Sequence, residues 1–154
     1  MKFEIRPTRF GSPVATALMK ATLDELGERY GDDGDGTPVL PLEFAPPDGG
    51  FFVAYADGVP AGCGGWRTLS GDDMVAEVKR MYVAPEFRGH GVAKALVRAL
   101  EDNARAAGRK QMWLETGDLQ PEAIVLYETC GYQRIADFGH YQGYPGVRSF
   151  GREL

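Results

Sequence analysis

The sequence has few of the residues that form covalent or metal-based frameworks. It contains two cysteines, Cys63 and Cys130, in 154 residues, and neither belongs to a CxxC pair or to a Cys/His spacing typical of zinc ligands. We therefore expect no disulfide framework and no metal, and we predict that both thiols are reduced and structural.

Long apolar runs and an excess of positive charge are also missing. No segment approaches the roughly 20 apolar residues that span a bilayer, and the N-terminus "MKFEIRPTRF" lacks the apolar core of a signal peptide, so we expect a cytoplasmic protein with no membrane partner. Seventeen basic and 22 acidic residues give a net charge of −5, whereas nucleic-acid binding favours a basic face. Nucleic acid is therefore not an expected partner.

What the sequence does contain is typical of one globular domain. Hydrophobic residues make up 44% and charged residues 25%, an ordinary composition for a folded protein. A chain of this length has little room for a second core. We predict a single domain over residues 1–154.

Secondary structure can be predicted from local patterns in the N-terminal part. Alternating residues at 2–9 indicate a strand that ends near Pro7, and Ser12 followed by proline indicates the N-cap of a helix that ends at Gly31. The glycine- and aspartate-rich segment 31–50 is predicted to be a long, solvated loop. Its aspartates do not match a calcium loop, because Thr37 and Pro38 occupy positions of that motif.

Further strands and helices follow along the chain. The Asp-Gly pair at 57–58 indicates a hairpin. The expected strands are 51–56, 59–69, 74–83, 110–116, 132–138 and 147–154, and the expected helices are 92–108 and 121–131. In the helix that begins near Val92, polar residues including Glu101 are predicted to face away from the apolar stripe. The order β-α-β through residues 74–116 requires at least one parallel strand pair.

The stretch "RGHGVA", residues 88–93, lies where a strand is followed by a helix. Gly89 and Gly91 allow backbone N–H groups to approach a ligand closely, and a helix N-terminus attracts anions. Arg88 adds a guanidinium that can bind a pair of phosphate oxygens. Alternatively, the turn simply requires glycine. The letters match neither a P-loop nor a dinucleotide-binding fingerprint.

Residues 75–133 contain "EVKRMYVAPEFRGHGVAKALV", "MWLET" and "QPEAIVLYETCGY", and this segment resembles the GCN5-related N-acetyltransferase (GNAT) family. The resemblance implies an α/β (α+β) fold, with a central mixed, mostly antiparallel sheet flanked by helices and a parallel pair at the acetyl-CoA cleft. It also implies acetyl-CoA as cosubstrate and transfer of its acetyl group to a primary amine by direct attack.

The resemblance also implies a set of cofactor-binding positions. Arg88, Gly91 and Ala93 fill the family's signature, whose backbone amides hold the pyrophosphate, and His90 would contribute a backbone donor with an exposed ring. Gln120 stands where the family often has asparagine. The complete predicted set is Met81, Val83, Arg88, Gly89, His90, Gly91, Val92, Ala93 and Gln120.

Two residues are candidates for proton transfer. Tyr127 occupies a family position from which a phenol can protonate the departing thiolate. Glu77 is a candidate general base, because strict alternation would place it on the same face as Met81 and Val83. An ion pair for Glu77 is an equally good interpretation, and a chain of water molecules could accept the proton instead.

The acceptor is the least defined part of the prediction. Phe138, Tyr141 and Tyr144 cluster between the last two strands, where aromatic rings could line a pocket for an amine or could pack under a loop. The acidic balance favours a small cationic amine. The alternative function is a CoA-binding sensor or interaction domain that has lost transfer, and the sequence leaves open a homodimer.

Overall fold

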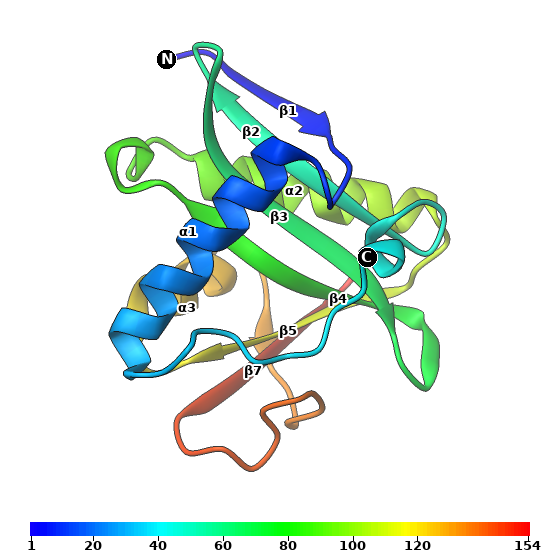
Figure 1. The fold of residues 1–154 in the computed structure, drawn as a ribbon. Helices are drawn as coiled ribbons and strands as arrows, with labels where there is room; N and C mark the ends of the chain where they lie inside the picture. Colours follow the sequence, from blue (N-terminus) through cyan, green and yellow to red (C-terminus); the bar gives the residue numbers. More distant parts are fainter.

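A computed structural model describes residues 1–154, and all of its strands belong to one sheet (Figure 1). The strands are β1 (Phe3–Pro7), β2 (Gly49–Ala56), β3 (Val59–Leu69), β4 (Asp72–Val83), β5 (Gln111–Gly117), β6 (Gln133–Arg134) and β7 (Val147–Glu153). The helices are α1 (Pro13–Tyr30), α2 (Val92–Ala106) and α3 (Pro121–Thr129), with short 3-10 turns at Pro41–Phe44 and Pro85–Phe87.

The sheet has the order β1-β2-β3-β4-β5-β7-β6. Every neighbouring pair is antiparallel except β4 and β5, which are parallel. The predicted mixed, mostly antiparallel sheet with one parallel pair is therefore confirmed. Helix α2 connects the parallel strands, as a crossover between parallel neighbours requires.

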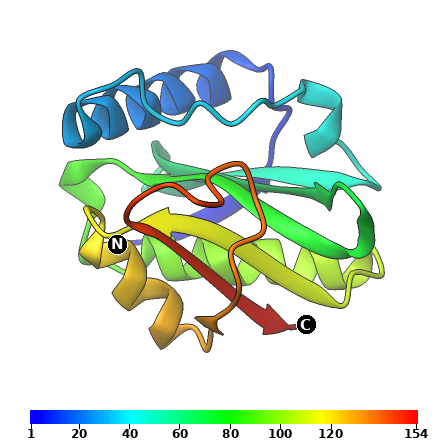
Figure 2. The ribbon, with the colours of Figure 1, turned by 90° about the horizontal axis from the view of Figure 1, so that it is seen from below.

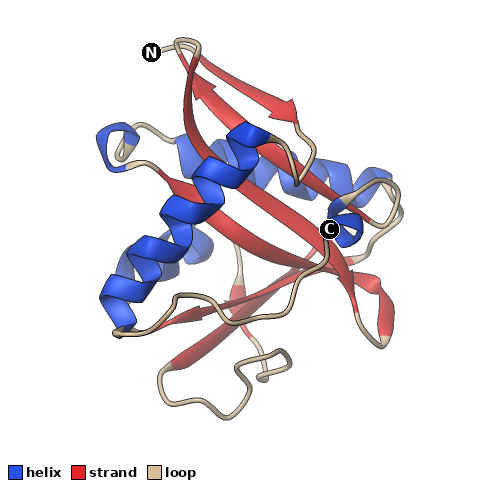
Figure 3. Ribbon diagram, viewed as in Figure 1, coloured by secondary structure: helices blue, strands red, loops and turns tan.

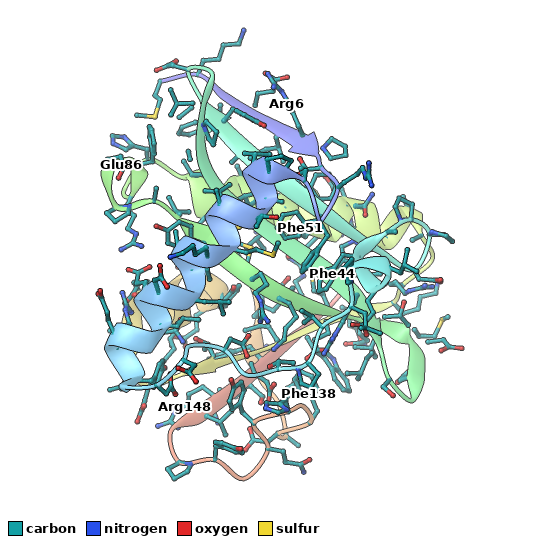
Figure 4. The ribbon with its side chains drawn as sticks, viewed as in Figure 1. Arg6, Phe44, Phe51, Glu86, Phe138 and Arg148 are labelled. Atoms are coloured by element: carbon teal, nitrogen blue, oxygen red, sulfur yellow. The ribbon has the colours of Figure 1, made fainter.

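The helices cover both faces of this sheet (Figures 2 and 3). Helix α2 buries Leu96 and Leu100 in a core that also contains Leu114 and Tyr127. On the opposite face, α1 and the segment that follows it cover a smaller core, in which the ring of Phe44 lies edge-on to that of Phe51 (Figure 4). The sheet therefore separates two environments, called here the α2 face and the α1 face.

Local sequence signals explain the element ends. The Ser12 side chain accepts a hydrogen bond from the backbone N–H of Ala15 and caps α1. Asp57 and Gly58 both have positive φ, as a tight turn between β2 and β3 requires. Both cysteines are free and buried. No helix combines the length and apolar composition needed to span a bilayer.

Two sequence predictions about packing are wrong. The strand expected at 132–138 is reduced to Gln133–Arg134, because the chain leaves the sheet after pairing briefly with β7. Glu101 does not face away from the core: it is buried on α2, where the Tyr132 hydroxyl donates to its carboxylate at 2.8 Å. Arg98 donates to the other oxygen at 2.7 Å, so buried polar partners replace solvent.

Candidate active site

Strands β4 and β5 pair only over a short length and then diverge. Their parallel ladder joins Val75–Glu77 to Gln111–Trp113 and continues no further. Beyond it, the facing edges of the two strands have no strand partner, and a cavity of about 550 Å³ lies along the opening. Its wall is formed by the second half of α1, residues 32–35, β4, the turn before α2, β5, α3 and the loop 141–147.

A β-bulge changes the direction of side chains along β4. In the pairing with β3, Cys63 is opposite Tyr82 and Gly65 is opposite Lys79, so Gly64 alone faces two residues of β4. Arg80 takes up the extra length with a φ of 61°. Met81 and Val83 consequently pack on the α2 face, whereas Glu77 and Lys79 point to the α1 face, where their polar partners lie.

The bulge corrects the prediction for Glu77. Strict alternation fails at Arg80, so Glu77 does not share a face with Met81 and Val83. The Glu77 side chain is only 4% exposed and accepts a hydrogen bond from Arg67 Nε at 3.0 Å. It does not contribute to the cavity wall. The structure thus contains the ion pair that the sequence offered as the alternative to a catalytic base.

The turn before α2 presents free backbone donors to the cavity. Gly91 is the N-cap of α2 with a φ of 86°, no side chain caps the helix, and its first turn contains no acidic residue. The backbone N–H groups from Gly89 to Lys94 donate to no group of the protein. A Cβ at Gly89 or Gly91 would meet no atom within 4 Å. This end of the cavity can therefore accept an anion at close range.

The Arg88 side chain is not a free cation at this turn. Its Nε donates to the carbonyl of Val83 at 2.8 Å, and an Nη donates to Glu25 on α1 at 2.7 Å. The hydrogen bond to Glu25 is the main cause of a raised pKa of Arg88. Arg88 thus fixes the turn against the end of β4 and against α1, and its positive charge is shared with Glu25.

The other predicted cofactor positions lie around the same cavity, except one. Its wall includes Met81, Val83, Val92 and Ala93. The His90 ring is exposed and lies outside the wall. Gln120 is the N-cap of α3, and its side-chain amide donates to the Tyr30 hydroxyl at 3.1 Å.

Tyr127 reaches the cavity from α3. It is 5% exposed, and its ring meets the ring of Tyr132 edge-on at 5.6 Å. Burial is the main reason why the pKa of its phenol is raised, and no hydrogen bond contributes to the shift. The hydroxyl therefore keeps its proton at neutral pH and has no acceptor within the protein.

Two loops that line the cavity are joined to each other, and this connection is called here the strap. The Tyr141 hydroxyl donates to Asp35 Oδ1 at 2.8 Å and accepts from the backbone N–H of Gly36 at 2.7 Å. The second Asp35 oxygen accepts from Arg80 and lies 3.6 Å from Lys79 Nζ. These contacts connect the loop after α1 to the loop before β7 and to the bulge of β4.

The strap corrects the prediction of a solvated loop at 31–50 for Asp35 and Thr37, which are largely buried, whereas residues 31–33 and 40–42 are exposed as predicted. Burial alone would raise the pKa of Asp35, but Lys79, Arg80 and hydrogen bonds from Thr37 outweigh it and lower the pKa to about 2. Burial, followed by the hydrogen bond to Asp35, raises the pKa of Tyr141 to about 12. Asp35 is therefore an ionised acceptor for a neutral phenol.

The three predicted acceptor-site aromatics occupy different surroundings. Tyr141 and Tyr144 line the cavity, and their rings meet edge-on at 5.2 Å. Phe138, labelled in Figure 4, lies outside the cavity wall and packs against Trp113 with ring centroids 5.2 Å apart. For Phe138 the structure has the packing role that the sequence left open.

The acetyltransferase (GNAT) family model matches residues 16–132. The chain belongs to this family. An IAA acetyltransferase of Azospirillum brasilense is 36% identical over 133 residues, which cover 84% of this chain and 86% of that protein. An uncharacterized N-acetyltransferase of Escherichia coli, YjgM, is 36% identical over 60% of this chain and 56% of its own length.

Solved structures agree with this GNAT assignment. A Klebsiella pneumoniae structure named as an acyl-CoA N-acyltransferase has a TM-score of 0.81 and 30% identity, and the match covers 99% of this chain and 97% of that one. A GNAT acetyltransferase of Elizabethkingia anophelis with acetyl-CoA bound shares the fold at 18% identity and a TM-score of 0.69, over 99% and 98% of the two chains. The protein is an acyl-CoA-dependent N-acyltransferase.

Two acidic residues of the GNAT site were missed by sequence reasoning. The sequence predicts a solvated loop around Asp35 and a strand that contains Glu115, and it gives neither residue a functional role. Both line the cavity. The alternation of "QMWLET" could have indicated Glu115, because buried Met112 and Leu114 fix the other face of the strand. No local signal identifies Asp35, whose partner Tyr141 is 106 residues away.

Proposed function

We propose that this GNAT domain, residues 1–154, transfers the acetyl group of acetyl-CoA to the primary amine of a small molecule by direct attack. One observation carries the proposal. A single cavity joins the free amides at the start of α2 to the aromatic residues of the acceptor loop, and Tyr127 of α3 lies on its wall. An anionic cofactor and an acceptor could thus meet where β4 and β5 diverge.

The cofactor would bind along the turn and the free edge of β4. Acetyl-CoA supplies an acetyl group activated as a thioester. Its pyrophosphate suits the free N–H groups from Gly89 to Lys94, because a helix N-terminus favours negative charge. The unpaired edge of β4 near Met81 and Val83 leaves backbone groups available to the pantetheine arm. Arg88, His90, Val92, Ala93 and Gln120 complete the proposed cofactor site.

Tyr127 is the proposed proton donor to the leaving thiolate. Its hydroxyl is free of partners within the protein and holds its proton because burial raises the phenol pKa. A raised pKa also makes full proton release harder, so the hydroxyl would act mainly by hydrogen bonding as negative charge develops on sulfur. Glu77 was predicted as the base, and its ion pair with Arg67 favours the structural alternative.

The acceptor end favours a small amine over a protein tail. The strap between Asp35 and Tyr141 joins two loops of the cavity wall and limits access for a folded partner. Tyr141 and Tyr144 offer ring faces to a cation or to an attached ring. Direct attack is supported by the two cysteines, because both are buried and neither lines the cavity.

The proposal is tested by two measurements on one protein sample. Isothermal titration with acetyl-CoA reports cofactor binding, and a thiol-release assay over a panel of amines, with mass spectrometry of the products, reports transfer. We expect binding and release with at least one small primary amine. Binding without release on every amine would instead favour the CoA-binding sensor or interaction domain.

A further inference from the structure

Glu115 lies on β5 where this strand has just separated from β4. It follows the last paired residue, Trp113, by two positions. Met112 and Leu114 are buried in the core of the α2 face, so alternation directs Glu115 to the α1 face, the side of the sheet that carries the strap. Glu115 also lines the cavity.

One oxygen of the Glu115 carboxylate is bound and the other is not. Oε2 accepts a hydrogen bond from the backbone N–H of Tyr141 at 3.0 Å. Oε1 is buried and has no hydrogen-bond partner. Gly139 lies directly against the carboxylate, and a Cβ at this position would clash with it. A buried carboxylate oxygen without a donor is unfavourable, and a proton or a ligand N–H would satisfy it.

The charged groups around Glu115 come from three segments. Lys79 and Glu77 face it from β4, Asp35 from the loop after α1, and its own carboxylate contacts the loop that contains His140 and Tyr141. Burial is the main reason why the pKa of Glu115 is raised. Lys79 and the Tyr141 N–H oppose that shift, while Glu77 and Asp35 add to it. The site therefore favours a carboxylate that readily takes up a proton.

The other acidic residues of the site are already neutralised. Asp35 bonds Arg80 and Tyr141, and Glu77 bonds Arg67. Glu115 forms no salt bridge. Its one hydrogen bond within the protein comes from the backbone N–H of Tyr141. Of the three acidic side chains Asp35, Glu77 and Glu115, Glu115 is therefore the one with a buried oxygen left to accept a hydrogen bond from a substrate.

We propose that Glu115 binds the acceptor's amino group and accepts its proton during acetyl transfer. This role rests on the proposed function. One proton of the ammonium group passes to the Glu115 carboxylate and then to solvent. The nitrogen forms its bond to the thioester carbonyl carbon, the C–S bond breaks, and the second nitrogen proton ends on the CoA sulfur, through the Tyr127 hydroxyl. Atoms and charge balance without a further reactant.

The test is Glu115→Gln, with Glu77→Gln as the matched control. An amide keeps an oxygen for the Tyr141 N–H but cannot accept a proton. We expect kcat/KM at neutral pH to fall by roughly 10²- to 10⁴-fold and to recover as pH rises and free amine becomes available. Acetyl-CoA affinity should stay unchanged. Because burial already disfavours the charged form, the melting temperature should not fall. Glu77→Gln should keep a rate near the wild-type value and shift the pH profile only slightly to lower pH, because Glu77 contributes less than burial to the raised pKa of Glu115.

Glu115→Asp covers the case in which the Gln variant does not fold. It keeps an ionisable carboxyl group but shortens the reach, so we expect a lower rate with the wild-type pH dependence. A wild-type rate and pH profile in Glu115→Gln would overturn the role, and so would a loss found only in Glu77→Gln. Failure of the wild-type protein to release CoA with any amine would overturn the proposed function itself, so the two failures are distinguishable.

Discussion

At the scale of single residues, Tyr127 and Tyr132 have similar rings in edge-on contact but different hydroxyl environments. The Tyr127 hydroxyl has no partner in the protein, whereas that of Tyr132 donates to buried Glu101 at 2.8 Å. We expect Tyr127→Phe to lower kcat by roughly 10²- to 10⁴-fold, with little change in melting temperature or acetyl-CoA affinity.

Tyr132→Phe is the matched control for this prediction. It leaves the Glu101 carboxylate without one of its donors, which we expect to cost about 1 to 3 kcal/mol of folding free energy and to leave kcat per folded molecule nearly unchanged. Thermal unfolding and steady-state kinetics measure both effects. If Tyr127→Phe lost stability and kept its rate, the phenol would be structural.

Gly91 and Gly108 allow a second comparison at this scale. They flank α2, have φ values of 86° and 85°, and would place a Cβ in open space. An alanine at either position would therefore cost similar backbone strain. We expect Gly91→Ala to weaken acetyl-CoA binding by about tenfold or more, because its Cβ would intrude on an anion at the turn. Titration of both variants measures the difference, and equal affinities would contradict the phosphate assignment.

How well the site could be predicted depends on whether a residue's role is local in sequence. The turn at Gly89–Gly91 was predictable, because a glycine-rich strand-to-helix connection carries its geometry in adjacent residues. Asp35 was not, since its role comes from Tyr141 and Lys79, which the fold brings from distant positions. For Glu115, alternation in "QMWLET" indicates the face of the strand but not the contact with Tyr141. The face of Glu77 was wrong for a related reason: nothing in "EVKRMYV" marks Arg80 as the bulge.

At the scale of elements, the strap depends on Asp35, whose pKa of about 2 lies below the ordinary value of 3.8. A lowered carboxyl pKa stabilises the folded state above the unfolded-state pKa, and this contribution is lost as pH falls from about 3.8 to about 2. It corresponds to about 2 kcal/mol at neutral pH. We expect Asp35→Asn to be less stable by at least this amount at pH 7.

The pH dependence provides the control for the strap. The difference in unfolding free energy between the wild-type protein and Asp35→Asn should shrink below pH 4. At low pH, protonation removes the negative charge of Asp35 in the wild type, and the asparagine variant lacks that charge at every pH. Denaturant titrations at several pH values measure it. If the unfolding free energies of the two proteins changed in parallel with pH, the contribution of Asp35 to stability would not depend on its charge.

The element order was predictable from the sequence, and the exceptions have physical causes. Periodicity located the helices and most strands, because one face of each element is apolar. It failed at 132–138, where alternation continues but only Gln133 and Arg134 find a partner strand. Pairing depends on a neighbour, which a local pattern does not contain.

At the scale of the whole molecule, cofactor binding should appear as stability. A ligand that binds only the folded state at 100 times its Kd adds about 2.7 kcal/mol. For a chain of this size, that corresponds to a rise in Tm of about 5 to 10 °C. We expect acetyl-CoA to produce such a rise in a thermal-shift measurement, and to produce less at the same concentration in Gly91→Ala. An unchanged Tm at saturating acetyl-CoA would contradict the cofactor assignment.

The bulge at Arg80 inserts one residue into β4 and so shifts the alternation of all side chains that follow it. Closing the bulge with Arg80 kept in the strand would restore strict alternation and move Met81 and Val83 to the α1 face, while Tyr82 would turn toward the α2 core. The side chains that β4 presents to the α1 face and to the α2 face beyond Arg80 would then exchange places. Deleting Arg80 would instead leave all three residues on their present faces. The backbone conformation at Arg80, with its φ of 61°, therefore decides which side chains at the end of β4 face each side of the sheet.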